Sequence, residues 1–234
     1  MDWKEKFTVI LSRPENPENI GLVARCMKNT GFRELRLVGV ERIDEKSQRT
    51  AVHARDILKK ALLYADLSHA VADLQIVFAA TAKPRKNFSS LSLWDAVEEI
   101  FRFPRAAKIG LLFGNERTGL LSEELQSSNF LFTIPQAGRQ PSYNLASAVL
   151  LTLFHIFTQG SIQKEESSKE KPLSRKEQED CIRLILNKLE KKKFIHLTNR
   201  RHMTGMIYDL FGRLTLTEKD RKLVLALFSK GLDE

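Results

Sequence analysis

Short, continuously apolar segments alternate with amphipathic segments along the first two thirds of the chain, and this pattern constrains the fold more than any other feature. The apolar segments predict strands at residues 7–11, 35–40, 75–81, 109–114 and 130–135. The intervening segments predict helices at residues 16–31, 51–64, 92–101, 122–128 and 144–157. Strands that are apolar on both faces are typical of a parallel sheet covered by helices on both sides. The sequence therefore predicts an α/β fold, with any ligand site beyond the carboxyl ends of the strands.

The first expected helix carries clear signals at both ends. Asn16 is a suitable N-cap, Pro17 suits the first helical position, and Gly31 is placed to end the helix in a left-handed turn. One face is apolar at helical spacing, with Ile20, Val23, Ala24 and Met27. The other face carries Gly21, Arg25 and Lys28. A bare glycine one turn before an arginine indicates that something lies against this surface.

The composition changes near residue 159. Residues 159–173 are polar, charged and free of aromatic side chains, which is typical of a linker. Ser174 and Glu177 then form a capping box that opens a further helix, and two more helices are expected around 203–214 and 218–230. We therefore expect a domain at residues 1–158, a linker at 159–173 and a small helical extension at 174–234.

The chain is basic, with a formal net charge of +9. The stretch from Ser161 onward holds 17 Lys and Arg against 12 Asp and Glu, with its densest patches in "KLEKKKF" and "TNRRHM". Such a surplus favours an anionic partner such as nucleic acid, although a solvated helix face explains the patches equally well. No apolar run is long enough to span a bilayer, and the charged start "MDWKEKF" has no signal-peptide pattern, so a cytoplasmic protein is expected.

Three segments that each follow an expected strand are candidates for chemistry. They are the first helix, the loop "FGNERTGL" at residues 113–120, and the stretch "IPQAGRQPSYNLASAV" at residues 134–149. Glycines in the second segment allow a sharp turn and close approach to a ligand, but most such loops are only turns. In the third segment, Ser142 and Asn144 precede an apolar helix, so simple helix capping also explains them.

Other common chemistries have little support in the sequence. The five histidines are scattered and the two cysteines lie far apart, so no metal site is expected. Ser142 has no nearby histidine or acid that would make it a nucleophile. No G-x-G-x-x-G follows a strand, which disfavours an ordinary dinucleotide site.

Taken together, the three segments resemble the three signature motifs of the SPOUT methyltransferase superfamily. The closest resemblance is to the tRNA methyltransferase H/J group of ribose 2'-O-methyltransferases. The first motif is matched by Asn19, Gly21 and Arg25, the second by Gly114, Asn115, Glu116 and Gly119, and the third by Ser142 and Asn144. Tyr143 departs from the family pattern, in which leucine is commoner. The helical extension is similar, more loosely, to that of the J branch, which methylates position 32 in the tRNA anticodon loop.

This resemblance implies a parallel sheet with a C-terminal trefoil knot and S-adenosylmethionine as cofactor. It implies catalytic roles for Arg25, Asn19, Ser142, Asn144 and Glu116. The residues it implies for cofactor binding are Thr81, Gly114, Asn115, Glu116, Gly119, Ile134, Ser142, Leu145 and Ala146. Arginine stays protonated, so we interpret Arg25 as a cation that grips a phosphate and stabilises the developing alkoxide, and not as a general base.

The resemblance also implies partners. A homodimer would pack through the first and last helices of the domain, with Gly21 allowing close approach and Arg25 serving the other subunit's cofactor. The expected RNA contacts are Arg85, Lys28, Arg200 and Arg201. The expected substrate is tRNA; ribosomal RNA, or a non-catalytic RNA-binding role on the same fold, are the alternatives.

Overall fold

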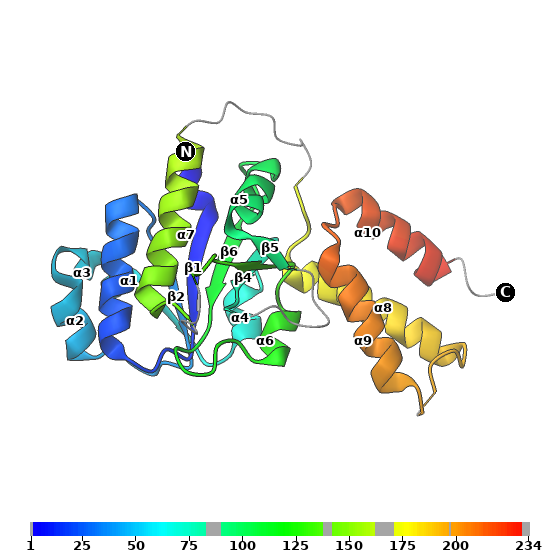
Figure 1. Ribbon diagram of the computed structural model, residues 1–234. Coiled ribbons are helices and arrows are strands. Elements are labelled where there is room, and N and C mark those ends of the chain that lie inside the picture. Colours follow the sequence, from blue (N-terminus) through cyan, green and yellow to red (C-terminus); the bar gives the residue numbers. More distant parts are fainter. Residues whose placement is uncertain (1, 83–89, 138–141, 162–170, 197, 231–234) are drawn as a thin grey trace.

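Seven parallel strands form a single sheet in the computed structural model, which describes residues 2–82, 90–137, 142–161, 171–196 and 198–230 (Figure 1). The strands are β1 (Phe7–Ser12), β2 (Glu34–Val38), β3 (Leu62–Tyr64), β4 (Ile76–Ala80), β5 (Ser90–Ser92), β6 (Ile109–Phe113) and β7 (Phe130–Thr133). Their order across the sheet is β3-β2-β1-β6-β4-β7-β5, and every neighbouring pair is parallel. The predicted parallel α/β sheet is confirmed.

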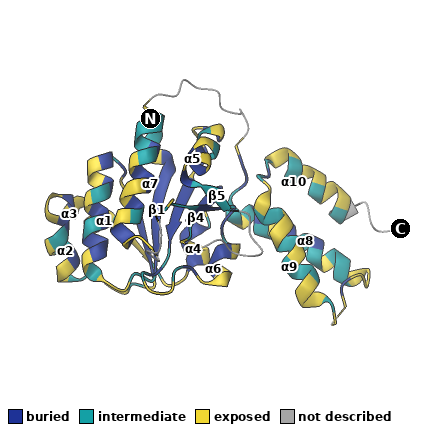
Figure 2. Ribbon diagram, in the orientation of Figure 1, coloured by how far each residue is buried: buried dark blue, intermediate teal, exposed yellow. Residues whose placement is uncertain are grey.

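Helices cover both faces of this sheet. They are α1 (Pro17–Thr30), α2 (Glu45–Ala51), α3 (Arg55–Lys60), α4 (Leu67–Val71), α5 (Leu93–Arg102), α6 (Ser122–Gln126) and α7 (Leu145–Gly160). Successive strand residues point to opposite faces, so Val9 joins the core beneath α1, α5 and α7, whereas Ile10 joins the core beneath α4 and α6. Figure 2 shows the buried inner sides of the helices against the centre of the sheet, where β1 and β6 are buried at every residue.

The caps expected for α1 are present. The side chain of Asn16 accepts a hydrogen bond from the Glu18 backbone at 3.0 Å, and Gly31 has a φ of 84°. The four residues of the predicted apolar face are all buried. The same helix packs along α7, so the first and last helices of the α/β part lie side by side (Figure 1).

Two predictions about local structure are wrong. Residues 51–64 do not form one helix, because α3 ends at Lys60 and residues 62–64 pair with β2 as an edge strand. Strand β2 ends at Val38 and not at Val40, because Gly39 takes a left-handed conformation with a φ of 71°. The short edge strand β5 had no signal in the sequence, since its Ser-Leu-Ser segment has neither length nor a continuous apolar pattern.

Gly21 does not provide close approach to a second subunit, which corrects the expectation from the resemblance. It is buried against α2 of the same chain, where Ser47 and Thr50 face α1. An ideal Cβ at this position would lie 2.1 Å from the Thr50 Oγ1 and 2.4 Å from the Ser47 carbonyl oxygen. The hydroxyl of Ser47 donates to the Pro17 carbonyl at 2.7 Å, which holds the two helices together. The glycine therefore serves packing within one chain.

The described part of the extension contains three helices, α8 (Arg175–Lys191), α9 (Arg200–Arg213) and α10 (Glu218–Leu225), followed by a π-helical turn at Ala226–Lys230. The predicted capping box at Ser174 and Glu177 is present. The backbone N–H of Arg175 donates to the Leu74 carbonyl at 2.8 Å, so α8 begins directly against the end of α4. Figure 1 shows the three helices beside the β5 edge of the sheet. Among the helices described, none has the length and apolar character needed to cross a membrane.

The packing of Gly21 predicts a loss of stability on substitution. We expect Gly21→Ala to lower the free energy of unfolding by about 1–3 kcal/mol, because two of the three nearest atoms are backbone and cannot move aside cheaply. In the control variant Gly205→Ala, the added methyl meets nothing within 4 Å, and a gain of about 0.5–1 kcal/mol is expected in a helix. Urea denaturation measures both. An unchanged unfolding midpoint for Gly21→Ala, together with a changed oligomeric state, would instead favour the intersubunit role.

Candidate functional site

A cavity of about 480 Å³ opens at the carboxyl ends of β4, β6 and β7, beside the start of α7. A volume of this size is typical of a site for a small molecule. Its walls are formed by residues 80–82, 113–120, 134, 136, 142, 143, 145 and 148. Parallel strands place their ligand sites at this edge, so the cavity lies where the sheet topology predicts it.

Two glycines shape the loop after β6. An ideal Cβ on Gly114 would lie 2.5 Å from the backbone of Gly119 and Leu120, so any side chain would force the loop open. Gly119 has a φ of 66°, which L side chains rarely adopt, and nothing lies within 4 Å of its ideal Cβ position. The backbone is therefore folded tightly on itself at Gly114 and leaves open space beside Gly119.

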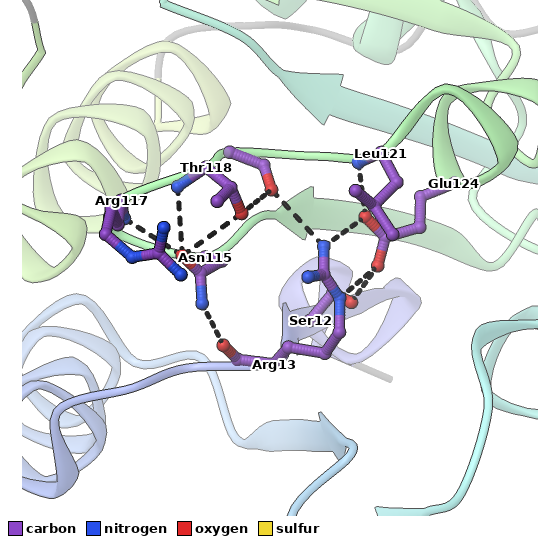
Figure 3. Close-up of polar contacts among 8 residues, drawn as sticks. Ser12, Arg13, Asn115, Arg117, Thr118, Leu121 and Glu124 are labelled. Atoms are coloured by element: carbon purple, nitrogen blue, oxygen red, sulfur yellow. Dashed lines mark hydrogen bonds and ion pairs between the residues drawn. The ribbon is translucent and has the colours of Figure 1, made fainter.

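Asn115 holds the turn between these glycines. Its Oδ1 accepts hydrogen bonds from the backbone N–H groups of Arg117 at 2.9 Å and Thr118 at 3.0 Å (Figure 3). Its Nδ2 donates to the carbonyl of Arg13, just beyond β1, at 2.8 Å. Asn115 is 7% exposed, so it acts mainly by fixing the backbone that lines the cavity.

Glu116 connects this loop to the start of α1 and, through α1, to α7. Its carboxylate accepts hydrogen bonds from the backbone of Glu15 at 2.8 Å and Asn16 at 3.2 Å, and from the Asn19 Nδ2 at 2.8 Å. The Oδ1 of Asn19 accepts from the Asn144 Nδ2 at 3.0 Å. Asn144 is the N-cap of α7, because its own Oδ1 accepts from the Ala146 backbone at 2.9 Å. One chain of hydrogen bonds therefore joins the three sequence segments singled out above.

The same contacts set the charge of Glu116. Burial opposes its ionisation, but the hydrogen bonds from Asn19 and from the backbone outweigh burial and hold its pKa below the ordinary value. The carboxylate is thus ionised at neutral pH and fully engaged with donors. It is also the sole carboxylate among the described residues of the cavity wall.

Most of the expected cofactor residues line this cavity. Those in its wall are Thr81, Gly114, Asn115, Glu116, Gly119, Ile134, Ser142 and Leu145. Ala146 is not part of the described wall; it is buried, and its carbonyl accepts a weak hydrogen bond from the Cys26 thiol at 3.6 Å. The wall also contains residues that were not expected, namely Ala80, Ala82, Phe113, Arg117, Thr118, Leu120, Gln136, Tyr143 and Ala148. Their position directly after strands β4, β6 and β7 was the signal that could have identified most of them.

Arg25 does not line the cavity of its own chain. It is exposed on α1, next to Cys26, whose thiol contacts the first turn of α7. Lys28, one turn further, is exposed and pairs with Asp56 of α3 at 2.6 Å. The motif arginine therefore sits near the start of α7 but outside the pocket formed by one chain.

The expected cations of the extension gather at one end of it. The last turn of α8 carries Lys188 and Lys191, the residues that follow it are Lys192 and Lys193, and the start of α9 carries Arg200 and Arg201. Arg200 pairs with Glu190 at 3.0 Å, and Arg201 is exposed. We call these six residues the basic tip. Arg85 lies outside the described residues.

Comparison with known proteins places this geometry in context. Residues 6–154 match the model described as the SpoU rRNA Methylase family. A tRNA (cytidine-2'-O-)-methyltransferase of Methanocaldococcus jannaschii is 30% identical over 231 residues, which cover 95% of this chain and 98% of that protein. A tRNA (cytidine/uridine/adenosine-2'-O-)-methyltransferase of Pseudomonas aeruginosa is 26% identical, covering 97% and 93%. The crystal structure of TrmJ from Z. mobilis superimposes with a TM-score of 0.82 at 26% identity, covering 97% and 99%.

The contacts of Glu116 predict a pH-dependent contribution to stability. We expect Glu116→Gln to lower the free energy of unfolding by about 1–2 kcal/mol at pH 7, because the amide offers one acceptor oxygen where the carboxylate offers two. The pKa of Glu116 is lower in the folded protein than the ordinary value of 4.5. Its contribution is therefore complete above that ordinary value and is lost as the pH falls through the folded pKa.

Urea denaturation at pH 7 and at about pH 4 measures this effect. The difference between wild type and variant should shrink at the lower pH. Glu15→Gln is the control, because it removes only an exposed ion pair with Arg117 at 3.3 Å and should cost less than about 0.5 kcal/mol. Equal effects of the two variants at pH 7 would contradict the anchoring role of Glu116.

Proposed function

We propose a function for this chain, which belongs to the SpoU rRNA methylase family. It is an S-adenosylmethionine-dependent RNA 2'-O-methyltransferase that acts on tRNA. The observation that carries this is the convergence of its three motif segments, through Glu116, Asn19 and Asn144, on one cavity. Relatives named as tRNA methyltransferases match nearly the whole chain, including the extension, which favours tRNA over ribosomal RNA. The intact motif residues argue against a purely non-catalytic RNA-binding role.

The cavity fits the cofactor in size and chemistry. When bound, S-adenosylmethionine supplies an electrophilic methyl group on a positively charged sulfur. Thr81, Gly114 and Gly119 would hold it largely through backbone groups, and Ile134 and Leu145 would provide apolar walls. The open space beside Gly119 is where a side chain would otherwise intrude. Ser142, which is exposed in the wall, would face the open side.

Within this reaction, the role of the protein is to orient a ribose 2'-hydroxyl and to favour its alkoxide form. Arg25 is the residue we assign to the RNA, where its guanidinium would grip a phosphate and stabilise the developing negative charge. Asn19, Asn144 and Glu116 would position Arg25 and the start of α7 through their shared hydrogen bonds. This assignment requires no proton transfer to arginine.

We propose that two copies of the chain complete the site. In α7, Leu150 and Leu151 are each 39% exposed and Phe154 is 56% exposed, although the helix also buries an apolar face against the sheet. Trp94 of α5 is 52% exposed in the same chain. Exposed apolar side chains of this size on one helix indicate an interface. A second copy packed on α7 and α1 would bring the exposed Arg25 of one chain toward the cavity of the other.

We also propose the trefoil knot and a cytoplasmic location. Strand β7 lies outside β4, on the side away from β6, and α7 then returns across the sheet to pack on α1. A return path of this kind is compatible with threading of the last segment through a loop. A cytoplasmic location follows from tRNA as the proposed substrate.

The extension is our candidate for gripping the tRNA body, with the anticodon loop, and position 32 within it, as the proposed target. The basic tip joins the two cationic patches of the sequence at the turn between α8 and α9. Cations that are close in space and on an outer turn provide the electrostatic footprint expected for RNA.

Arg25→Ala tests the catalytic assignment. We expect methyl transfer to fall about a hundredfold or more, as for the removal of one key electrostatic interaction, with unchanged cofactor affinity. The control variant Arg33→Ala removes an exposed cation just beyond the same helix and should retain activity. Methylation assays and isothermal titration with S-adenosylmethionine measure the two quantities. Near-normal turnover of Arg25→Ala would remove this residue from the mechanism.

Mixing inactive subunits extends the same experiment to the proposed dimer. Ala82 is exposed in the cavity wall, so Ala82→Trp should block the pocket without disturbing α1. If Arg25 serves the partner's cavity, each mixed dimer of Arg25→Ala and Ala82→Trp subunits has one complete site. Because roughly half of randomly paired dimers are mixed, activity should recover to about a quarter of wild type. No recovery in demonstrated mixed dimers would mean that each chain builds its site alone.

The basic tip predicts a change in salt dependence. In the triple variant with Lys191→Gln, Lys193→Gln and Arg201→Gln, we expect weaker tRNA binding. The slope of log affinity against log salt concentration is negative, and its magnitude should decrease by about 0.7–0.9 for each phosphate that the protein no longer neutralises. The matched triple variant on α2 and α3, with Lys46→Gln, Lys59→Gln and Lys60→Gln, removes the same charge from exposed positions elsewhere. Equal slopes for the two variants would mean that the basic tip is only a solvated helix face and does not contact the RNA.

A further inference from the structure

Arg13, directly after β1, has an unusual backbone conformation, and hydrogen bonds hold this backbone on two sides. Its φ is 51°, in the left-handed region that residues other than glycine rarely adopt. Its N–H donates to the Val38 carbonyl at 2.9 Å, and its carbonyl accepts from the Asn115 Nδ2 at 2.8 Å. The residue is therefore fixed between the end of β2 and the loop that follows β6.

The side chain of Arg13 lies across the end of that loop. Its Nε and Nη2 donate to the two oxygens of Glu124 at 3.0 and 2.7 Å, and Nη2 also donates to the Gly119 carbonyl at 3.3 Å (Figure 3). A guanidinium suits this task because its donors diverge in a rigid plane.

Glu124 is the other half of this contact. Its carboxylate also accepts hydrogen bonds from the Ser12 hydroxyl and, at 2.6 Å, from the backbone of Leu121 at the start of α6. It is 9% exposed, and although burial opposes its ionisation, the bonds from Arg13, Ser12 and Leu121 hold its pKa below the ordinary value. Figure 3 shows the three donors converging on this single carboxylate. We call Arg13 and Glu124 the clasp.

We propose that the clasp is a positioning device for cofactor binding, acting through the Gly119 carbonyl on the loop that lines the cavity. Gly119 and Leu120 belong to the cavity wall, and Leu121 follows immediately. Glu116 anchors the same loop to the residues that follow Arg13, so the clasp and Glu116 fix its two ends. A binding site needs its backbone held in position to within about half an ångström, and the clasp holds the backbone in this way at Gly119. The inference rests on the proposed cofactor cavity.

Arg13→Lys separates positioning from stability. A lysine retains the charge beside Glu124, but its single ammonium lacks the fork that reaches Glu124 and Gly119 together. We expect the Kd for S-adenosylmethionine to rise about tenfold, with little change in Tm. Glu124→Asp is the second variant, because it retains the charge and withdraws it by one methylene. We expect the same direction of change from it, whether or not Arg13→Lys folds well.

The ion pair of the buried Arg36 with Asp73 provides the structural control. Arg36 of β2 is 3% exposed and pairs with Asp73, away from the cavity wall. Asp73→Asn should lower Tm and leave cofactor affinity unchanged. If Arg13→Lys and Glu124→Asp also change Tm alone, the clasp only stabilises the fold and the inference is overturned.

Ala82→Trp separates failure of the inference from failure of the proposed function. Loss of S-adenosylmethionine binding in Ala82→Trp, with normal binding in Arg13→Lys and Glu124→Asp, would retain the cavity and reject the clasp. Normal binding in all three variants would reject both. Weaker binding in all three, at nearly unchanged Tm for the clasp variants, is the result that supports the inference.

Discussion

The carboxylate of Glu116 is the interaction on which the arrangement of the site depends. It accepts two backbone N–H groups at the start of α1, where the helix dipole favours a negative charge, and a third hydrogen bond from Asn19. Through Asn19 it reaches Asn144, which caps α7. Without this carboxylate, two backbone donors and one buried amide would need new partners, and the loop after β6 would lose its link through Asn19 to α1 and α7. One ionised group thus links three segments that are distant in the sequence.

The sheet explains why these groups stand where they do. Strands β1 and β6 are buried along their whole length and are almost entirely apolar, so chemistry is concentrated in the loops at their carboxyl ends. The helices that cover the two faces of the sheet also have an outward surface. Helix α1 buries one face on the sheet and presents Arg25 on the other, and α7 buries Val149 and Leu153 while it exposes Phe154. The surfaces that pack on the sheet and the surfaces proposed to meet RNA or a second copy therefore lie on different sides of the same helices.

Sequence was sufficient where near neighbours along the chain decide what a residue does. The helix caps at Asn16, Gly31 and Ser174, the parallel sheet, and the loops after β6 and β7 were all predicted correctly. It was insufficient where contacts distant in sequence decide. Gly21 is required by Thr50 of α2, and β3 forms only because β2 offers an edge to pair with. The motif residues were identified by resemblance, but spacing alone did not reveal that several of them hold one another.

The cavity wall restricts how methyl transfer can be promoted. Among its described residues Glu116 is the sole acid, and three donors already occupy its oxygens and lower its pKa, so it is a poor proton acceptor. Arg117 in the same wall and Arg25 outside it carry guanidinium groups, which act in proteins as cations and not as bases. The described wall of a single chain thus offers orientation and positive charge but no poised base. With no base in the described wall, the proton of a ribose hydroxyl held in line beside a cation would pass to water as the new bond forms. Acceleration would then come mainly from alignment and from stabilising the developing oxyanion. This makes the exact shape of the loop, which Asn115, Glu116 and Arg13 maintain, as important as any group that touches the substrate.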